Sequence, residues 1–209
     1  MNSNLTRPLQ ELPTNSTLQK MEFHMLPLVN VDGYIYSMTP TSDTKDRLKR
    51  KNMADSGCQD QLFNGVDLNR NFPAGFNLTS DCLYRSRSGE VERDCLCSNS
   101  YQGPHPFSEP ETRAARDALS SAVPWIAVDI HGSLGAWLTP PNTRMASPEE
   151  KTKPAWDLDF LATFIEEEYG VRYAVSSTSA LMGVMGGTMM GWIYEHLGVE
   201  RTYAVEVTR

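Results

Sequence analysis

The sequence predicts an α/β protein, in which helices alternate with the strands of an open sheet. Two runs rich in β-branched and apolar residues, at 125–131 and 202–208, have the composition of strands. Each run is preceded by a stretch with helical features, at 109–122 and 151–170. Because 209 residues are enough to enclose one hydrophobic core, we expect these elements to form a single domain.

The N-terminal part divides into a polar segment and an apolar one. Residues 1–20 are polar, contain two prolines, and are predicted to form a loop or a poorly ordered end. Residues 21–29 have the apolar density of a buried strand, and residues 30–33 have the composition of a turn. The predicted folded domain therefore comprises residues 21–209.

Both predicted helices have recognisable ends. The stretch 109–122 has Pro110 near its start, acidic residues in its first turn and good helix formers after them. The stretch 151–170 closes at Gly170, and a short strand is predicted at 173–175. Six large apolar residues of the second helix recur at helical spacing and are expected to face the core: Trp156, Leu158, Phe160, Leu161, Phe164 and Ile165.

Each of the two main strands carries one conspicuous polar residue. The first strand ends at His131, and open α/β sheets place ligand-binding side chains at such strand ends; the alternative is an ordinary surface histidine. In the second strand, Glu206 lies on the same face as Ala204 and Thr208. A carboxylate in mid-strand is costly to bury without a partner, so Glu206 either forms a structural ion pair or has a function.

Charge and hydropathy exclude several classes of protein. The net charge of −7 argues against nucleic acid as a partner. The longest apolar runs are too short to span a bilayer. The residues after Met1 include neither a basic start nor an apolar core, so we expect no signal peptide within this sequence.

The segment 65–72 (GVDLNRNF) concentrates polar groups between apolar residues. Asp67, Asn69 and Arg70 offer a hydrogen-bond acceptor, an amide and a guanidinium fork, and the last two are well suited to hold a carboxylate. The alternative is a polar turn with an internal Asp–Arg ion pair. A basic run at 47–51 has the composition of a solvated face.

GVDLNRNF and the block YQGPHPFSEPE at 101–111 together resemble the signature of the zinc metallocarboxypeptidases, the family of carboxypeptidases A, B and E. The resemblance extends over residues 23–209. It implies a three-layer α/β/α sandwich around a mixed, largely parallel sheet, incomplete at both ends. It also implies a zinc-dependent enzyme that hydrolyses the C-terminal peptide bond of peptides or proteins and acts as a monomer.

The resemblance assigns a role to five residues. His131 corresponds to a ligand of the single zinc ion, Glu206 to the glutamate that takes a proton from the zinc-activated water, and Arg50 to the arginine that polarises the scissile carbonyl. Asn69 and Arg70 correspond to the clamp on the substrate's C-terminal carboxylate.

The resemblance does not extend to all of the family's metal-binding residues. The family's first metal motif is His-x-x-Glu, and none of the four histidines begins one, so only one of three expected zinc ligands is present. Two hypotheses follow. The chain is part of an active zinc carboxypeptidase, or it is an inactive protein that binds peptide C-termini through Asn69 and Arg70.

The specificity region also departs from the family. Met182 stands at or beside the position of the family's lid tyrosine, and residues 189–191 contain no acid. The resemblance therefore implies a preference for neutral or apolar C-terminal side chains.

Cysteines and glycosylation signals favour a secreted protein. Cys58 and Cys97 match a disulfide of secreted family members, which leaves Cys82 and Cys95 as a second candidate pair. Glycosylation sequons begin at three positions: Asn4, Asn15 and Asn77.

Overall fold

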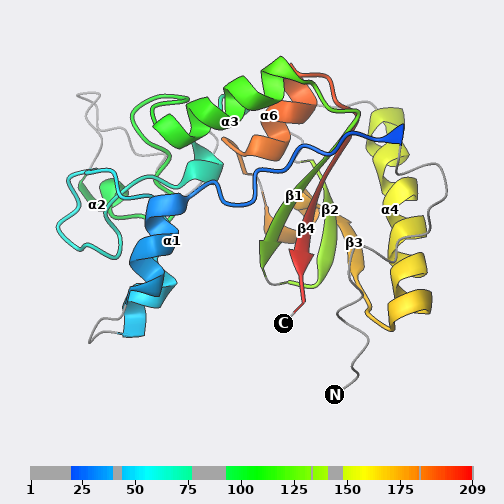
Figure 1. The fold of residues 1–209 in the computed structure, drawn as a ribbon, viewed down its shortest axis with the longest axis horizontal. Coiled ribbons are helices and arrows are strands. Elements are labelled where there is room, and N and C mark those ends of the chain that lie inside the picture. Colours follow the sequence, from blue (N-terminus) through cyan, green and yellow to red (C-terminus); the bar gives the residue numbers. More distant parts are fainter. Residues whose placement is uncertain are drawn as a thin grey trace.

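The computed structural model describes residues 20–39, 44–76, 93–132, 134–140, 148–183 and 185–208. In this part of the chain four strands form one sheet in the order β1-β4-β2-β3 (Figure 1). Their bounds are β1 Ile126–Gly132, β2 Ala136–Thr139, β3 Ala174–Ser177 and β4 Arg201–Val207. Strand β4 is parallel to β1, β2 is parallel to β3, and β2 runs antiparallel to β4. The predicted mixed, largely parallel sheet is therefore confirmed.

The described helices are α1 Val31–Met38, α2 Arg93–Leu96, α3 Pro110–Ser121, α4 Pro148–Tyr169, α5 Thr178–Met182 and α6 Met189–His196, with short 3₁₀ turns η3 Thr44–Leu48 and η4 Leu68–Arg70. Helices α3 and α4 confirm the two predicted from sequence. None of the helices in these described ranges has the length and apolar composition needed to cross a membrane.

Helices cover the two faces of the sheet. On one face, Met190 of α6 packs with Ala204 of β4 and with Ala136 and Leu138 of β2, and α3 lies over α6 (Figure 1). On the other face, the hydroxyl of Tyr203 donates to Asp157 of α4 at 3.1 Å. Since consecutive residues of a strand point to opposite faces, α6 and α4 lie on opposite sides of β4. This is the predicted three-layer α/β/α arrangement.

The main core joins the polar segment 65–72 to α3 and α6. Its fully buried members come from these helices and from the chain just before and after them: Phe72, Ala74, Ala115, Trp192, Ile193 and Val199. Rings of Phe72, Phe107 and Trp192 pack with centroid separations of 5.4, 5.5 and 5.7 Å. The segment that carries the predicted carboxylate clamp is thus fixed by aromatic packing.

Two residues predicted for the core are exposed on α4. Leu158 is fully buried, whereas Phe160 and Phe164 are 75% and 45% exposed. The helix contacts the sheet along one side only, and among the described residues nothing covers the other side. The side chain of Trp156 lies outside the described part.

The prediction of a buried strand at residues 21–29 is wrong. The segment is an extended coil whose apolar side chains face solvent, with Phe23 65% and Met25 81% exposed. It crosses in front of the sheet toward α1 (Figure 1). A strand needs a partner for its backbone groups, and no described strand pairs with this segment. The predicted turn after it is instead the start of α1, where the Asn30 side chain accepts from the amide of Gly33 at 3.1 Å.

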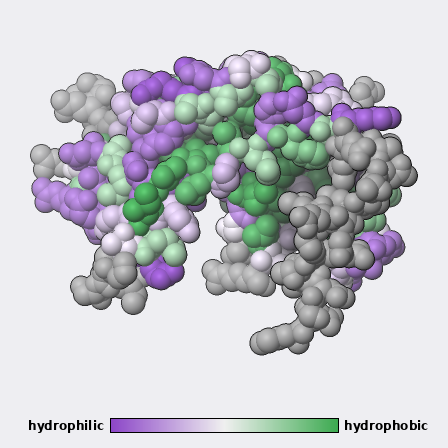
Figure 2. Space-filling view, viewed as in Figure 1, coloured by the Kyte–Doolittle hydropathy of each residue, from purple (hydrophilic) through white to green (hydrophobic). Residues whose placement is uncertain are grey.

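Strand β1 is partly buried on one face and exposed on the other. It lies at an edge of the described sheet, and Ile126, Val128 and Ile130 are 42%, 45% and 71% exposed on the face away from α6. Figure 2 shows apolar surface over the strands in the middle of the view.

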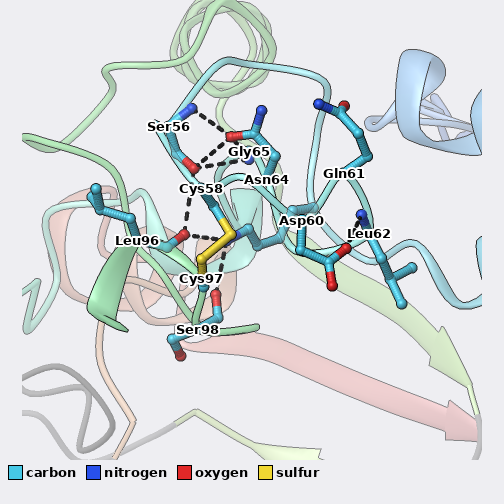
Figure 3. Close-up of a disulfide and its surroundings, with 12 residues drawn as sticks. Ser56, Cys58, Asp60, Gln61, Leu62, Asn64, Gly65, Leu96, Cys97 and Ser98 are labelled. Carbon is cyan, nitrogen blue, oxygen red and sulfur yellow. Dashed lines mark hydrogen bonds between the residues drawn. A yellow bond between two sulfur atoms is a disulfide. The ribbon is translucent and has the colours of Figure 1, made fainter. Parts of the chain in front are cut away.

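A disulfide joins Cys58 to Cys97, as the family resemblance implies (Figure 3). The adjoining loop is held by Lys51, which is fully buried and donates to the carbonyls of Leu96 and Ser98 at 2.8 and 2.9 Å. Cys82, residues 1–19 and the three glycosylation sequons lie outside the described residues, so the second disulfide and the polar N-terminal segment stay predictions.

Removing this disulfide should destabilise the fold. The cysteines are 39 residues apart, and closing a loop of that length contributes about 4 kcal/mol in the chain-entropy description. We expect the variant with both Cys58→Ser and Cys97→Ser to lose roughly 2–4 kcal/mol in the free energy of unfolding, measured by urea titration. Reduction of the unmodified protein should produce a similar loss. An unchanged urea midpoint in both experiments would contradict the prediction.

Candidate active site

The segment 65–72 forms a tight turn whose polar side chains hold its own backbone. Asp67 precedes η4, and its carboxylate accepts from the amide of Asn69 at 3.1 Å. The amide of Asp67 donates to the carbonyl of Tyr101 at 2.8 Å. Asn71 is fully buried and donates to the carbonyl of Gln102 and the hydroxyl of Ser108. The two sequence blocks that carry the family resemblance therefore bind each other directly.

Arg50 is the partner of Asp67. Its Nε and Nη2 donate to the same carboxylate oxygen, at 2.9 and 2.8 Å. The Asp67 side chain is buried, whereas that of Arg50 is 46% exposed. An Asp–Arg pair thus exists in this motif, but with Arg50 instead of Arg70. Asp67 fixes the end of a guanidinium that is still accessible from solvent.

Arg70 is buried beside the segment 185–189. Its Nη1 donates to the carbonyl of Asn69 at 2.6 Å, and its Nη2 donates to the sulfur of Met185 at 3.0 Å. The Asn69 side-chain oxygen accepts from the amide of Met189 at 2.9 Å. Its side-chain amide nitrogen thereby points the other way, toward Nε2 of His131 at 3.4 Å.

Glycine at residue 187 allows the backbone of this segment to approach the backbone of Arg70 closely. A Cβ atom at Gly187, where φ is +70°, would stand 2.0 Å from the carbonyl oxygen of Arg70. The amide of Phe72 donates to the carbonyl of Gly187, and the amide of Gly187 donates to the carbonyl of Ala74. A side chain at residue 187 would therefore force the two segments apart and separate Arg70 from Met185.

His131 and Glu206 stand side by side at the ends of two parallel strands. They are register partners of β1 and β4. Glu206 is 8% exposed. The ring nitrogen Nε2 of His131 lies 2.9 Å from a carboxylate oxygen of Asp129 and 3.4 Å from the amide nitrogen of Asn69. The strand ends thus meet the turn that carries Asn69 and Arg70.

Nearby charges set the protonation of His131. Its hydrogen bond to Asp129 raises the imidazole pKa, and burial opposes this by lowering it. The negative charge of Glu206 raises the pKa further, while the positive charge of Arg50 lowers it. All of these groups therefore lie within electrostatic reach of one another.

The described residues do not by themselves fit a catalytic zinc ion. Such a site takes three protein ligands and leaves a position open for water. Over the described ranges, no group of three His, Cys, Asp or Glu side chains is arranged to hold a metal. The Nε2 nitrogen of His131 is occupied by Asp129. This agrees with the absence of a His-x-x-Glu motif from the sequence.

The structure brings the five predicted site residues into one region. Contacts run from Arg50 through Asp67 to Asn69, and from Asn69 to His131, which pairs with Glu206. Arg70 follows Asn69 directly but faces Met185. This geometry is compatible with the predicted roles, which stay predictions.

Sequence reasoning missed two contacts at this site. Asp129 lies two residues before His131 in the same strand, and alternation in a strand places both on one face; that spacing could have identified it. Met185 has no comparable signal, because its contact with Arg70 joins residues 115 positions apart.

Comparison with known proteins agrees with this geometry. The family model described as zinc carboxypeptidase (peptidase M14) matches residues 5–209. Mast cell carboxypeptidase A of Mus musculus is 29% identical over 192 residues, which cover 91% of this chain and 42% of the relative. Carboxypeptidase B of Astacus astacus is 30% identical over 222 residues, which cover 98% of this chain and 64% of the relative.

Solved structures show the same fold. Bovine thrombin-activatable fibrinolysis inhibitor, solved in complex with tick carboxypeptidase inhibitor, matches with a TM-score of 0.67 at 27% identity, over 86% of this chain and 56% of the other. Carboxypeptidase A from Helicoverpa armigera shares the fold with a TM-score of 0.68 at 24% identity, over 86% and 41% of the two chains. The chain spans about half the length of most of these relatives. Since the family model matches nearly all of its residues, the chain belongs to the zinc carboxypeptidase family.

Proposed function

We propose that this chain supplies the C-terminus-binding and proton-transfer part of a zinc carboxypeptidase site, which removes residues from the C-termini of peptides or proteins. The observation that carries the proposal is the approach of Asn69 to His131 at 3.4 Å, with Glu206 beside His131 on the next strand. His131 is the candidate zinc ligand, and the two further ligands are not among the described residues.

Asn69 and Arg70 are suited to bind the substrate's carboxylate. An arginine fork can donate two parallel hydrogen bonds to one carboxylate. Arg70 is largely buried, and burial strengthens its interaction with an anion because less water competes. The amide nitrogen of Asn69, which lies 3.4 Å from Nε2 of His131, would add a donor on that side. A free C-terminus would therefore be held next to the strand ends.

Arg50 and Glu206 are suited to the reacting bond. Asp67 orients the guanidinium of Arg50, whose exposed part can donate to a substrate carbonyl as negative charge develops on its oxygen. Glu206 would accept a proton from the attacking water and pass it to the leaving amine. Its register position beside His131, the candidate metal ligand, supports this role.

The purified 209-residue chain should show no zinc-dependent release of C-terminal amino acids, because a complete donor set is absent from its described part. The assay follows free amino acids from an acylated dipeptide with and without added zinc. A zinc carboxypeptidase with all its ligands serves as the positive control. Release that is abolished by a chelator would overturn the prediction and require metal ligands elsewhere in the chain.

The alternative function is binding of peptide C-termini without hydrolysis. It is favoured by the combination of a formed arginine site with the lack, in the part of the chain that the structure describes, of three side chains arranged to hold a metal. A transcript that continues upstream of residue 1 with an in-frame His-x-x-Glu motif would favour the enzyme. Tight binding of C-terminal carboxylates by a protein that never holds zinc would favour the binding module.

Location and specificity are part of the proposal. The Cys58–Cys97 disulfide supports a secreted protein, since disulfides persist in oxidising compartments. The absence of acidic residues at 189–191 supports a preference for neutral or apolar C-terminal side chains. Glycosylation and a monomeric state stay predictions.

A further inference from the structure

We propose that Met185 is a cap that tunes the affinity of Arg70, and that a C-terminal carboxylate binds by displacing the Met185 sulfur from the guanidinium. The inference rests on the proposed role of Arg70 as the carboxylate clamp. It adds a competitor from the chain itself, which sets how tightly that clamp binds a free C-terminus.

The two terminal nitrogens of Arg70 have partners of unequal strength. Nη1 donates to the backbone carbonyl of Asn69, which belongs to the same rigid turn. Nη2 donates to the Met185 sulfur at 3.0 Å. A thioether is a weak acceptor, whereas a carboxylate forms charge-assisted hydrogen bonds about twice as strong as neutral ones. The Met185 contact is therefore the exchangeable one.

The Met185 sulfur contacts Nη2 of Arg70, the nitrogen that takes part in every bidentate contact with a carboxylate. A guanidinium can grip a carboxylate through Nη1 and Nη2, or through Nε and Nη2. Nη2 belongs to both pairs, so a sulfur on Nη2 competes with bidentate binding. Of these two contacts, the one with the Met185 sulfur is weaker than the one with the Asn69 carbonyl, so it costs less to displace.

The local chain allows the side chain to move while its backbone stays. Residues 186 and 187 are fixed by hydrogen bonds between Gly187 and the backbone of Phe72 and Ala74. On the other side of Met185, Gly183 has a φ of +80° and open space around its Cβ position. Methionine is unbranched and has three rotatable bonds, so its sulfur can leave Arg70 without a shift of the backbone.

A sulfur cap has a consequence for affinity. A ligand must offer a better acceptor than sulfur to displace Met185 from the largely buried guanidinium. A C-terminal carboxylate meets that condition through charge and two oxygens, whereas a C-terminal amide offers one neutral oxygen. The cap therefore lowers the affinity of the clamp for a free C-terminus by the free energy needed to displace the sulfur, and it leaves the amide unaffected.

The test is calorimetric titration of the 209-residue chain with an acetylated dipeptide ending in leucine, as the free acid and as the amide. Met185→Leu keeps an apolar side chain of similar size and removes the acceptor, so the acid should bind roughly two- to tenfold more tightly. Met185→Gln keeps the length and supplies a stronger acceptor, so the acid should bind more weakly. Neither change should affect the amide.

Met38→Leu is the matched control. The sulfur of Met38 also accepts from an arginine, Arg47, at 3.8 Å on the exposed surface, and its removal should leave peptide binding unchanged. Equal binding of the acid by the unmodified protein, Met185→Leu and Met185→Gln would overturn the cap. So would a change of the same sign in both variants, which indicates a purely structural effect.

A different experimental result would contradict the proposed function and not only the cap. If Arg70→Ala leaves the preference for acid over amide intact, Arg70 is not the carboxylate clamp. If Arg70→Ala removes that preference but the Met185 variants do nothing, the clamp stands and the cap is wrong. In the Arg70→Ala background, Met185→Leu should no longer change the affinity for the acid, since the two residues act through one contact.

Discussion

Replacing Glu206 with glutamine is expected to lower turnover by about 10²–10⁴-fold in a form of this protein that holds a complete set of zinc ligands. Glutamine has nearly the same shape as glutamate but cannot accept a proton from water at neutral pH. Glu206 is largely buried beside His131, so no bulk solvent base can easily replace it. Steady-state hydrolysis of an acylated dipeptide measures the effect.

Two controls separate proton transfer from damage to the fold. Glu206→Gln should leave the zinc content unchanged, measured by metal analysis of the purified protein. Glu200→Gln makes the same chemical change at an exposed position just before β4 and should retain full activity. If Glu206→Gln turns over substrate at the unmodified rate, the proton acceptor lies elsewhere.

Local sequence patterns were sufficient for the long elements. Helix α3 begins at Pro110, one residue after the predicted start, α4 ends immediately before Gly170, and β1 and β4 occupy the two apolar runs. These elements are specified by residues within a few turns or strand positions of each other. The roles of His131 and Glu206 on these strands came from the family resemblance, because the local pattern alone left a surface histidine and a structural ion pair as alternatives.

Elements that depend on distant partners were not predictable in this way. Residues 21–29 have the composition of a strand, yet they form an exposed coil, because composition does not supply a neighbouring strand. Phe160 and Phe164 repeat at helical spacing, yet they are exposed because the described chain covers one side of α4 only. An apolar pattern shows which face of an element favours burial, but it does not identify the element that packs against that face.

Two helix starts were missed although the sequence contains their signals. Asn30 caps α1, and Thr188 caps α6 with its hydroxyl accepting from the amide of Gly191 at 3.0 Å. Both are preferred N-cap residues. Gly33 favoured an interpretation of residues 30–33 as a turn, whereas Asn30 and Thr188, the residues just before the two helices, were the better guide.

Replacing Arg70 with alanine should weaken binding of a free C-terminus by on the order of ten- to a hundredfold, since a hydrogen bond to a charged group contributes roughly 1.5–3 kcal/mol. Arg70→Lys should restore only part of the loss, because an ammonium cannot reproduce the two parallel donors of a guanidinium. Arg47→Ala is the control, because Arg47 is exposed and its side chain likewise contacts a methionine sulfur.

The most direct measurement of the central claim combines this change with a change in the ligand. Calorimetry gives the affinity of the unmodified chain and of Arg70→Ala for the same acetylated dipeptide as the free acid and as the amide. If Arg70 holds the C-terminal carboxylate, the mutation and the replacement of the acid by the amide remove the same interaction. The two changes together should then lower the affinity little more than either alone. Losses that add independently would show that Arg70 does not contact the carboxylate and that the segment 65–72 is not a clamp for C-termini.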